Sequence, residues 1–447
     1  KFCRAVLAVQ HASTVNENIR FAIQLRYQDL CMIFHRVSSA FLDLKAAEYT
    51  ECSVRVQADL SVYQSVLDKV IPTGARIRPG FRDARAGRFS ALRGGLRWLS
   101  ARGGPLTRPR SFTLQENHLL LQEKSGSQVS LTRLLSPLND PANAGANVHP
   151  LCHSAVDCVV ECALEAYDGQ LDGFVIRILE AQFRDLLNSS LEHLDSTARS
   201  LDIPVGKELH SGTATYATRL TSLLHRRENK PVYRYLHGGD RALFKDFWWP
   251  ACEYLFATTV VCHGELEANM LSETLANQNT LFWTDQKPHF HAVGSMHHKT
   301  MWSRTQSPRG ESLRSQRKKL LVSGGSFVQD FRHMPQMKLH DVPYFQWQRR
   351  LLQALSGEGY EVTVKRHPKG FLAQQLVFEG LCAQEITQGT IAEQFTQADA
   401  AIFDMAGSAF LEALGPTLPV VLIDVPNRQL STLGRKHLGL VREIAPA

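Results

Sequence analysis

The sequence predicts an α/β protein with two lobes, each built around a parallel sheet, and with additional helices in the first lobe. Three observations support this prediction. From residue 231 onward, short apolar runs alternate with helical segments, which is typical of parallel sheets with helices on both faces. The runs are apolar throughout, as expected for strands that are buried on both faces. Polar and glycine-rich clusters follow several runs, at the strand ends where ligands of such sheets bind.

The composition is that of an ordinary globular protein. Hydrophobic residues make up 44% and charged residues 21% of the 447 residues, a length that favours two or three domains. The sequence contains no apolar run long enough to span a membrane and no signal-peptide pattern. It begins with Lys1 instead of Met, so we expect a fragment of a longer protein. The 9 cysteines follow no paired spacing, which favours reduced thiols in the cytoplasm.

The net charge of +7 is concentrated in an arginine-rich segment, residues 72–110, which has a single acid, Asp83. Such a segment suits an anionic partner: a membrane surface, a lipid-diphosphate acceptor or a nucleic acid. A solvated loop is the alternative. We expect no nucleic-acid partner, because the sequence contains no recognised nucleic-acid-binding motif.

The first half of the chain predicts short strands followed by long helices. Apolar runs at 3–9 and 29–35 predict strands, and a less regular pattern at 58–71 predicts a helix. A further short strand is predicted at 116–123. Apolar residues then recur at helical spacing in three segments, at 155–167, 174–200 and 213–227.

The second half shows two groups of alternating strands and helices. The first group predicts strands at 232–236, 280–283 and 291–293, a strand or a buried run at 254–261, and a helix at 265–276. A polar, basic stretch at 302–319 follows. The second group predicts strands at 320–322, 360–365, 400–403 and 419–423, and helices at 344–356, 391–397 and 409–414. We therefore divide the chain into an N-terminal lobe with helical insertions (1–300), a linker (301–318) and a C-terminal lobe (319–447).

A cluster of cations follows the predicted strand 360–365. Lys365, Arg366 and His367 stand at the strand end, and Pro368 fixes the chain direction into a loop that also holds Lys369. Three cations and an imidazole at one strand end are suited to phosphate. A surface strand end that has this composition by chance is the alternative.

A turn of small residues follows the predicted strand 400–403 and leads into a helix. Gly407 and Ser408 lie in this turn, and Glu412 lies one helical turn further on. The N–H groups of a helix N-terminus bind phosphate well, and Glu412 is placed to accept hydrogen bonds from ribose hydroxyls. Alternatively, Ser408 is an N-cap and Glu412 a surface acid. Ser323 and Gly324, at the end of the first strand of this lobe, are expected to line the same site.

The segment VTVKRHP at 362–368, followed by ADAAIFDMAGSAFLEALGPTLPVVLID at 398–424, resembles the C-terminal lobe of GT-B enzymes that use cytidine-activated donors. It is similar to bacterial sialyltransferases and Kdo transferases, and to the CDP-glycerol glycerophosphotransferases. The resemblance implies a GT-B fold with two Rossmann-like lobes. It also implies that His367 and Ser408 contact the donor phosphate, with Lys365 and Arg366 beside them, and that Glu412 holds the donor ribose.

The segments YRYLHGGD at 233–240, EYLFATTVVCHGELEANML at 253–271 and HFHAVGS at 289–295 resemble the end of the N-terminal lobe in the same enzymes. There, a His-Gly strand end lies in the cleft between the lobes. His237 is therefore our first candidate for the base that deprotonates an acceptor hydroxyl, a task that suits imidazole near neutral pH. Asp240 and Glu265 are alternatives, and His263 is a weaker candidate.

The chain departs from the glycerophosphotransferase pattern in two places. His-Gly-Gly-Asp stands at 237–240 where those enzymes have His-Gly-Thr, and Gly407-Ser408 replaces a Ser-Ser pair. Both departures favour transfer of a sugar over transfer of a polyol phosphate. The chain is also expected to stop short of the C-terminal helix that commonly returns to the N-terminal lobe in this fold.

The predicted function is transfer of a sugar, Kdo-like or sialic-acid-like, from a cytidine nucleotide to a bacterial surface glycan such as lipopolysaccharide or capsule. The alternatives are a CDP-polyol phosphotransferase and a non-catalytic GT-B scaffold in polysaccharide assembly. We expect a nucleotide-sugar donor, a glycan or lipid-linked acceptor, and peripheral contact with the inner membrane from the cytoplasm. No other cofactor and no metal are expected, although a His-rich patch is present at His289, His291, His297 and His298.

Overall fold

The computed structural model describes residues 2–9, 15–49, 112–114, 128–129, 148–169, 171–199, 208–212, 216–244, 253–276, 287–305, 318–325, 327, 341–368, 376–415, 418–425 and 429–438. The arginine-rich segment 72–110 lies outside the described residues, and so do the predicted elements at 58–71, 116–123 and 280–283.

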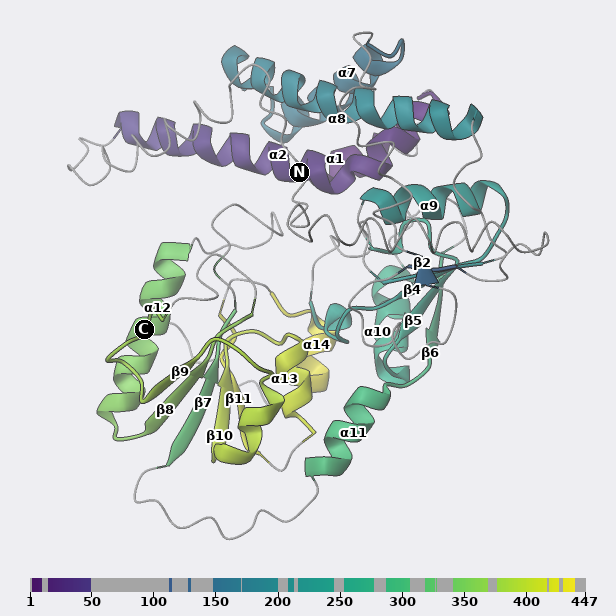
Figure 1. Ribbon diagram of the computed structural model, residues 1–447. Coiled ribbons are helices and arrows are strands. Elements are labelled where there is room, and N and C mark those ends of the chain that lie inside the picture. Colours follow the sequence, from purple (N-terminus) through teal and green to yellow (C-terminus); the bar gives the residue numbers. More distant parts are fainter. Residues whose placement is uncertain are drawn as a thin grey trace, which may run out of the picture.

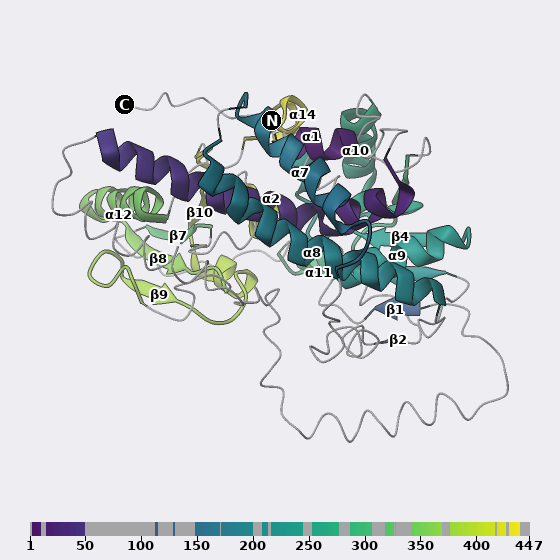
Figure 2. The same ribbon diagram turned by 90° about the horizontal axis from the view of Figure 1, so that it is seen from above.

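A layer of long helices forms one side of the molecule. Figure 1 shows this layer above both sheets, and the view from above in Figure 2 shows it running across them. Its helices pack through apolar stripes at helical spacing, such as Leu179, Phe183 and Leu187, which are fully buried. The layer consists of α1 (Phe2–Val9), α2 (Glu17–Tyr49), α7 (Cys152–Ala166) and α8 (Gly173–Arg199).

The strands predicted at 3–9 and 29–35 are wrong, because both runs lie in helices, α1 and α2. Residues 21–27 of α2 are all buried, since α2 contacts α1, α7, α8 and α9 (Tyr216–Arg227). A helix that is buried on all sides does not show an amphipathic period, so its apolar runs resemble buried strands. The three amphipathic helices predicted after residue 150 are confirmed as α7, α8 and α9.

The first sheet has 6 strands in the order β2-β1-β3-β4-β5-β6, and all of its pairs are parallel. Helices α9 and α10 (Glu265–Ala276) pack against its strands. Its short β3 gave no signal in the sequence. The strands are β1 (Phe112–Leu114), β2 (Gln128–Val129), β3 (Leu209–Ser211), β4 (Val232–Tyr235), β5 (Thr259–Cys262) and β6 (His289–Ala292).

The second sheet has 5 strands in the order β11-β10-β7-β8-β9, again all parallel. The first strand of this lobe, β7, therefore lies beside the fourth, β10, and the chain builds outward from this pair in both directions. Such a reversal is a topological switch point, where ligands of parallel sheets bind. The strands are β7 (Lys319–Ser323), β8 (Glu361–Lys365), β9 (Gln384–Ile386), β10 (Ala400–Phe403) and β11 (Val420–Leu422).

The predicted fold class is confirmed. The molecule has two lobes with Rossmann-like parallel sheets and a helix-rich first lobe, which is the GT-B arrangement. In the C-terminal lobe, the predicted helices are α12 (Asp341–Gly357), the 3-10 helix η6 (Ala392–Gln397) and α13 (Ser408–Ala413). The first residues of the predicted linker, 301–305, form the end of α11 (Met296–Thr305). The domain boundaries themselves stay a prediction.

Near its end, the chain returns to the N-terminal lobe. Helix α14 (Thr432–Leu438) contacts the 3-10 helix η3 (Arg241–Leu243), which follows β4. The backbone N–H of Ser431 donates to the carbonyl oxygen of Leu243 at 2.7 Å. A Cβ at Gly434 would lie 2.3 Å from that same oxygen, so the helix approaches η3 backbone to backbone. The expectation that the chain stops short of a returning helix is therefore wrong.

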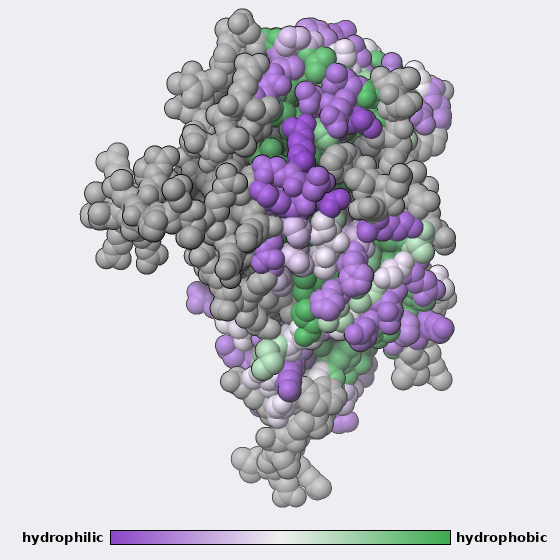
Figure 3. Space-filling view, turned by 90° about the vertical axis from the view of Figure 1, so that its right-hand side faces the viewer, coloured by the Kyte–Doolittle hydropathy of each residue, from purple (hydrophilic) through white to green (hydrophobic). Residues whose placement is uncertain are grey.

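The described surface has mixed polarity, and the described cysteines are buried or half-buried. None of the described helices is long and apolar enough to cross a membrane. Figure 3 shows hydrophilic and hydrophobic residues intermixed over the described part of one face, the right-hand side of Figure 1. Cys152, Cys158, Cys162, Cys262 and Cys382 form no disulfide. Burial raises the pKa of the Cys162 thiol to about 12, so it stays protonated and unreactive near neutral pH.

Candidate functional site

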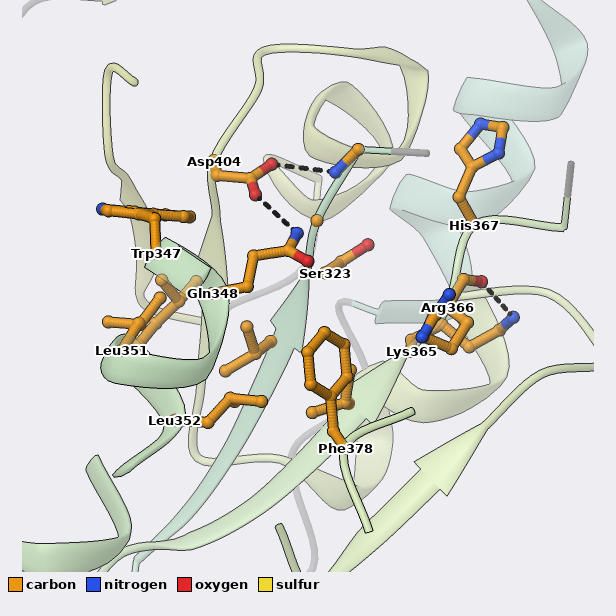
Figure 4. Close-up of a pocket in the computed structure, with 15 residues that line it drawn as sticks. Ser323, Trp347, Gln348, Leu351, Leu352, Lys365, Arg366, His367, Phe378 and Asp404 are labelled. Carbon is orange, nitrogen blue, oxygen red and sulfur yellow. Dashed lines mark hydrogen bonds between the residues drawn. The ribbon is translucent and has the colours of Figure 1, made fainter. Parts of the chain in front are cut away.

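A hollow lies at the carboxyl ends of β7, β8 and β10, at the switch point of the second sheet. The space among its lining side chains, with open solvent included, is about 420 Å³. Figure 4 shows Trp347 and Gln348 of α12 on one side and the end of β8 on the other. The structure brings several predicted donor-site residues together around this hollow: Ser323, Gly324, Lys365, Arg366 and His367.

The buried carboxylate of Asp404 occupies the switch point, directly after β10. Its Oδ1 accepts the backbone N–H of Gly325 at 2.9 Å. Its Oδ2 accepts the hydroxyl of Tyr344 at 2.6 Å and Nε2 of Gln348 at 3.1 Å. Burial raises the pKa of Asp404, and these hydrogen bonds oppose the rise. The backbone N–H of Gly325 is therefore already held by a carboxylate.

Gly324 is required by the way α12 packs against β7. A Cβ at this position would lie 2.1 Å from Nε2 of Gln348 and 2.9 Å from Oδ2 of Asp404. Any side chain there would push the amide away from the carboxylate. Gly324 was predicted in the site, whereas Asp404 had no predicted role, although it directly follows a predicted buried strand. Gln348 carried no signal, because its role depends on the fold.

Arg366 is a structural cation. Its Nη1 lies 2.9 Å from Oε1 of Glu385, and the two side chains are only 7% and 4% exposed. Its guanidinium also lies 5.2 Å from the ring centroids of Phe327 and Phe378. Glu385 in turn accepts backbone N–H groups at residues 377 and 378. Arg366 is therefore already paired, which leaves less of its charge for a ligand than the sequence suggested.

Lys365 and His367 differ in their exposure. Lys365 is buried, and its Nζ donates to the carbonyl oxygen of Arg366 at 3.0 Å. Burial lowers the pKa of Lys365, with a smaller opposing effect from Glu393. His367 is half-buried at the edge of the same hollow. Of Lys365, Arg366 and His367, His367 is therefore the residue best placed to meet a ligand.

Gly407 and Ser408 are not among the residues that line the hollow, and Ser408 faces the N-terminal lobe. Gly407 is the N-cap of α13, and Ser408 is its first residue. A Cβ at Gly238, after β4, would lie 1.9 Å from Oγ of Ser408, and one at Gly239 would lie 3.3 Å from Leu411. Both glycines have positive φ, +95° and +74°, which favours glycine. We call Gly238, Gly239, Ser408 and Leu411 the interlobe contact.

Glu412 also reaches the N-terminal lobe. Its Oε1 lies 3.3 Å from Nε2 of His297 in α11. Burial raises the pKa of Glu412, and His297 opposes the rise. Glu412 and Ser408 are therefore engaged across the two lobes in this structure, and their predicted roles toward ribose and phosphate stay predictions.

The three predicted bases have different surroundings. His237 is exposed and directly precedes the two glycines of the interlobe contact. Asp240 is buried, and Arg241 pairs with it at 2.9 Å and with Glu253 at 3.2 Å. A buried carboxylate in such an ion pair stabilises the fold and is not available to accept a proton, which makes Asp240 a poor base. Glu265 is exposed at the start of α10.

His263, which the sequence ranked below these residues, has the better hydrogen-bond geometry. Its Nδ1 lies 3.2 Å from Oε2 of Glu267, which also accepts the backbone N–H of His263 at 2.8 Å. Its Nε2 is buried and has no hydrogen-bond partner among the described residues. A ring oriented by a carboxylate in this way is typical of catalytic bases. The ring of His298 lies 5.4 Å away, centroid to centroid.

A second hollow lies on the other side of Asp404, between the lobes. Phe244 of the N-terminal lobe and Leu430 line it, together with Tyr344 and Asp404. Phe244 and Leu430 also form an antiparallel bridge. Within the part of the chain that the structure describes, no three His, Cys, Asp or Glu side chains lie close enough together to hold a metal ion.

The comparisons with known proteins find a distant likeness in fold. No protein-family model matches the chain, and no curated protein matches its sequence. Among solved structures, UDP-GlcNAc 2-epimerase from Neisseria meningitidis bound to UDP-GlcNAc is similar at 11% sequence identity, with a TM-score of 0.35 over 70% of this chain and 83% of that chain. A likeness this distant carries no inference about ligand or reaction.

Proposed function

We propose that the chain binds a nucleotide-activated sugar in its C-terminal lobe and transfers the sugar to an acceptor hydroxyl at the junction of the lobes. The observation that carries the proposal is the hollow at the switch point, which has polar residues and the half-buried His367 at its edge. His367 would contact the donor phosphate. His237, exposed beside the interlobe contact, would take the proton from the acceptor.

The finer parts of the proposal rest on the sequence resemblance alone. They are a cytidine nucleotide as donor, a Kdo-like or sialic-acid-like sugar, and a bacterial surface glycan or lipid-linked glycan as acceptor. Contact with an anionic membrane rests on the charge of residues 72–110. Transfer of a polyol phosphate instead of a sugar would be recognised by the mass added to the acceptor.

Calorimetric titration with CMP, CDP, UDP and GDP tests the proposal. We expect CMP or CDP to bind, and His367→Ala to weaken binding roughly tenfold or more through loss of a charge-assisted hydrogen bond. His153→Ala, which changes an exposed histidine in α7, is the control and should bind as the unchanged protein does. Binding of UDP or GDP instead would keep the nucleotide site and overturn the donor class.

A non-catalytic scaffold is the second candidate function, and two observations favour it. The guanidinium of Arg366 is paired with Glu385, and Gly238 packs directly against Ser408. These contacts engage Arg366 and Ser408, two residues that the sequence assigned to the donor nucleotide. If none of the four nucleotides binds, the scaffold becomes the better explanation.

A further inference from the structure

Gln348 of α12 has an oxygen atom without a partner. The residue is 8% exposed, and its Oε1 is shut off from solvent with no hydrogen-bond partner among the residues that the structure describes. Buried polar atoms are nearly always hydrogen-bonded, so one that is not calls for an explanation. Gln348 lines the hollow at the switch point. In Figure 4, its side-chain oxygen points in the direction of Ser323, which lines the same hollow.

The neighbouring carboxylate fixes which end of the amide is left over. An amide carries two donor hydrogens on nitrogen and an acceptor oxygen, and its two orientations have nearly the same shape. Nε2 donates to Oδ2 of Asp404 at 3.1 Å. The reversed amide would set its oxygen against that carboxylate, and two acceptors repel. The unpartnered atom is therefore an acceptor, and its missing partner must be a donor.

The other residues that line the hollow indicate which kind of chemical group carries that donor. Apolar side chains make up much of the hollow: Leu351, Leu352, Val364, Phe378 and Ile402. Among the described residues that line the hollow, the only carboxylate is Asp404, which is buried and already holds three donors. A phosphate placed beside it would meet a like charge in a poorly screened site. A neutral, flat group that bears N–H donors fits better, and a nucleobase is such a group.

We infer that this hollow is the subsite for the base of the nucleotide, and that Oε1 of Gln348 accepts an N–H from the edge of that base. The inference rests on the proposed function and deepens it, because it separates the base from the phosphate. The phosphate would then lie toward His367 at the edge of the hollow. Asp404 is a positioning residue, since it holds the amide of Gln348 in the accepting orientation.

The test compares ligands that have and lack the base, on two variants that each remove one donor to Asp404. Gln348→Met keeps the length of the side chain but removes the acceptor. Tyr344→Phe also removes a donor to Asp404 but leaves Gln348 in place. The probes are CMP, ribose 5-phosphate, and CMP whose exocyclic amino group is dimethylated, with affinities measured by calorimetry.

We expect Gln348→Met to lower the affinity for CMP roughly tenfold or more, because the base loses its acceptor, and to leave the affinity for ribose 5-phosphate unchanged. Dimethylation should weaken binding to the unchanged protein but add little further loss in Gln348→Met, as expected for two changes that remove one hydrogen bond. Tyr344→Phe should retain the preference for CMP over the dimethylated analogue.

Three results would overturn the inference. If Gln348→Met binds CMP as tightly as the unchanged protein does, Gln348 does not contact the base, although the nucleotide site stands. If the variant loses CMP and ribose 5-phosphate alike, the amide supports the fold of the site instead of the base. If the unchanged protein binds no nucleotide at all, the proposed function fails together with the inference.

Discussion

The two sheets end in different ways on the sides where ligands of parallel sheets bind. After β7, β8 and β10 of the C-terminal lobe, the strand ends surround a hollow. After β4 of the N-terminal lobe, Gly238 and Gly239 pack against Ser408 and Leu411 of the other lobe. The first arrangement leaves room for a ligand, and the second joins the lobes and presents histidines beside the joint. Under the proposed function, nucleotide binding and proton transfer are therefore divided between the lobes.

The largest expected effect comes from a variant that removes the proposed base and leaves the nucleotide site intact. His237→Asn should lower the turnover of the nucleotide-sugar donor by roughly 10²–10⁴-fold, which is the usual contribution of a general base, and should leave nucleotide affinity unchanged. Steady-state rates and calorimetry together measure this split. His289→Asn, which changes an exposed histidine at the start of β6, is the matched control.

Two outcomes would change the comparison. Loss of nucleotide affinity in His237→Asn would place this histidine in the binding site. Unchanged turnover would remove His237 as the base and turn attention to His263, whose Nδ1 faces Glu267.

A smaller effect is expected where the chain rejoins the N-terminal lobe. Gly434→Ala should destabilise the protein by about 1–3 kcal/mol, the usual cost of overpacking, because its Cβ would lie 2.3 Å from a backbone oxygen of η3. Urea unfolding followed by fluorescence measures the change. Gly357→Ala, whose Cβ would meet nothing within 4 Å at the end of α12, should be neutral. Equal stability of the two variants would show that α14 does not hold the lobes together.

The smallest effect concerns the pair between Glu412 and His297. Because burial raises the pKa of Glu412, the folded protein binds a proton at this site at a pH where the unfolded chain has released it. This contribution to stability is therefore fully present below the pKa of the unfolded chain, and it is lost as the pH rises through the raised pKa of the folded protein. Glu412→Gln should flatten this dependence and change the free energy of unfolding by less than about 1 kcal/mol.

Unfolding curves over a series of pH values measure this dependence. Glu379→Gln, at an exposed position, should keep the slope of the unchanged protein. A steeper slope in Glu412→Gln than in the unchanged protein would contradict the expected direction of the pH dependence.

The sequence predicted the C-terminal lobe better than the helical layer, for a physical reason. The strand at 400–403 is a short buried run between two acids, Asp399 and Asp404, so its bounds are visible in the sequence. The buried part of α2 gave no such bounds, since it is covered by helices on several sides. The edge strand β9 is partly exposed and carries no apolar run, so its place follows only from pairing with β8.

The candidate site shows the same limit. His367 could be assigned to the edge of a site because it follows a recognisable strand. Gln348 could not, since it lies in the middle of α12 and reaches the hollow only after that helix packs on β7. The pairing of Arg366 with Glu385 was equally hidden, because the two residues come from different strand regions.

The return of α14 to η3 also bears on how the lobes can move. Strand β11 belongs to the second sheet, whereas α14, which follows it, packs on η3 of the N-terminal lobe. A motion that separated the lobes at this point would have to break the hydrogen bond from Ser431 to Leu243 and open the close backbone approach at Gly434.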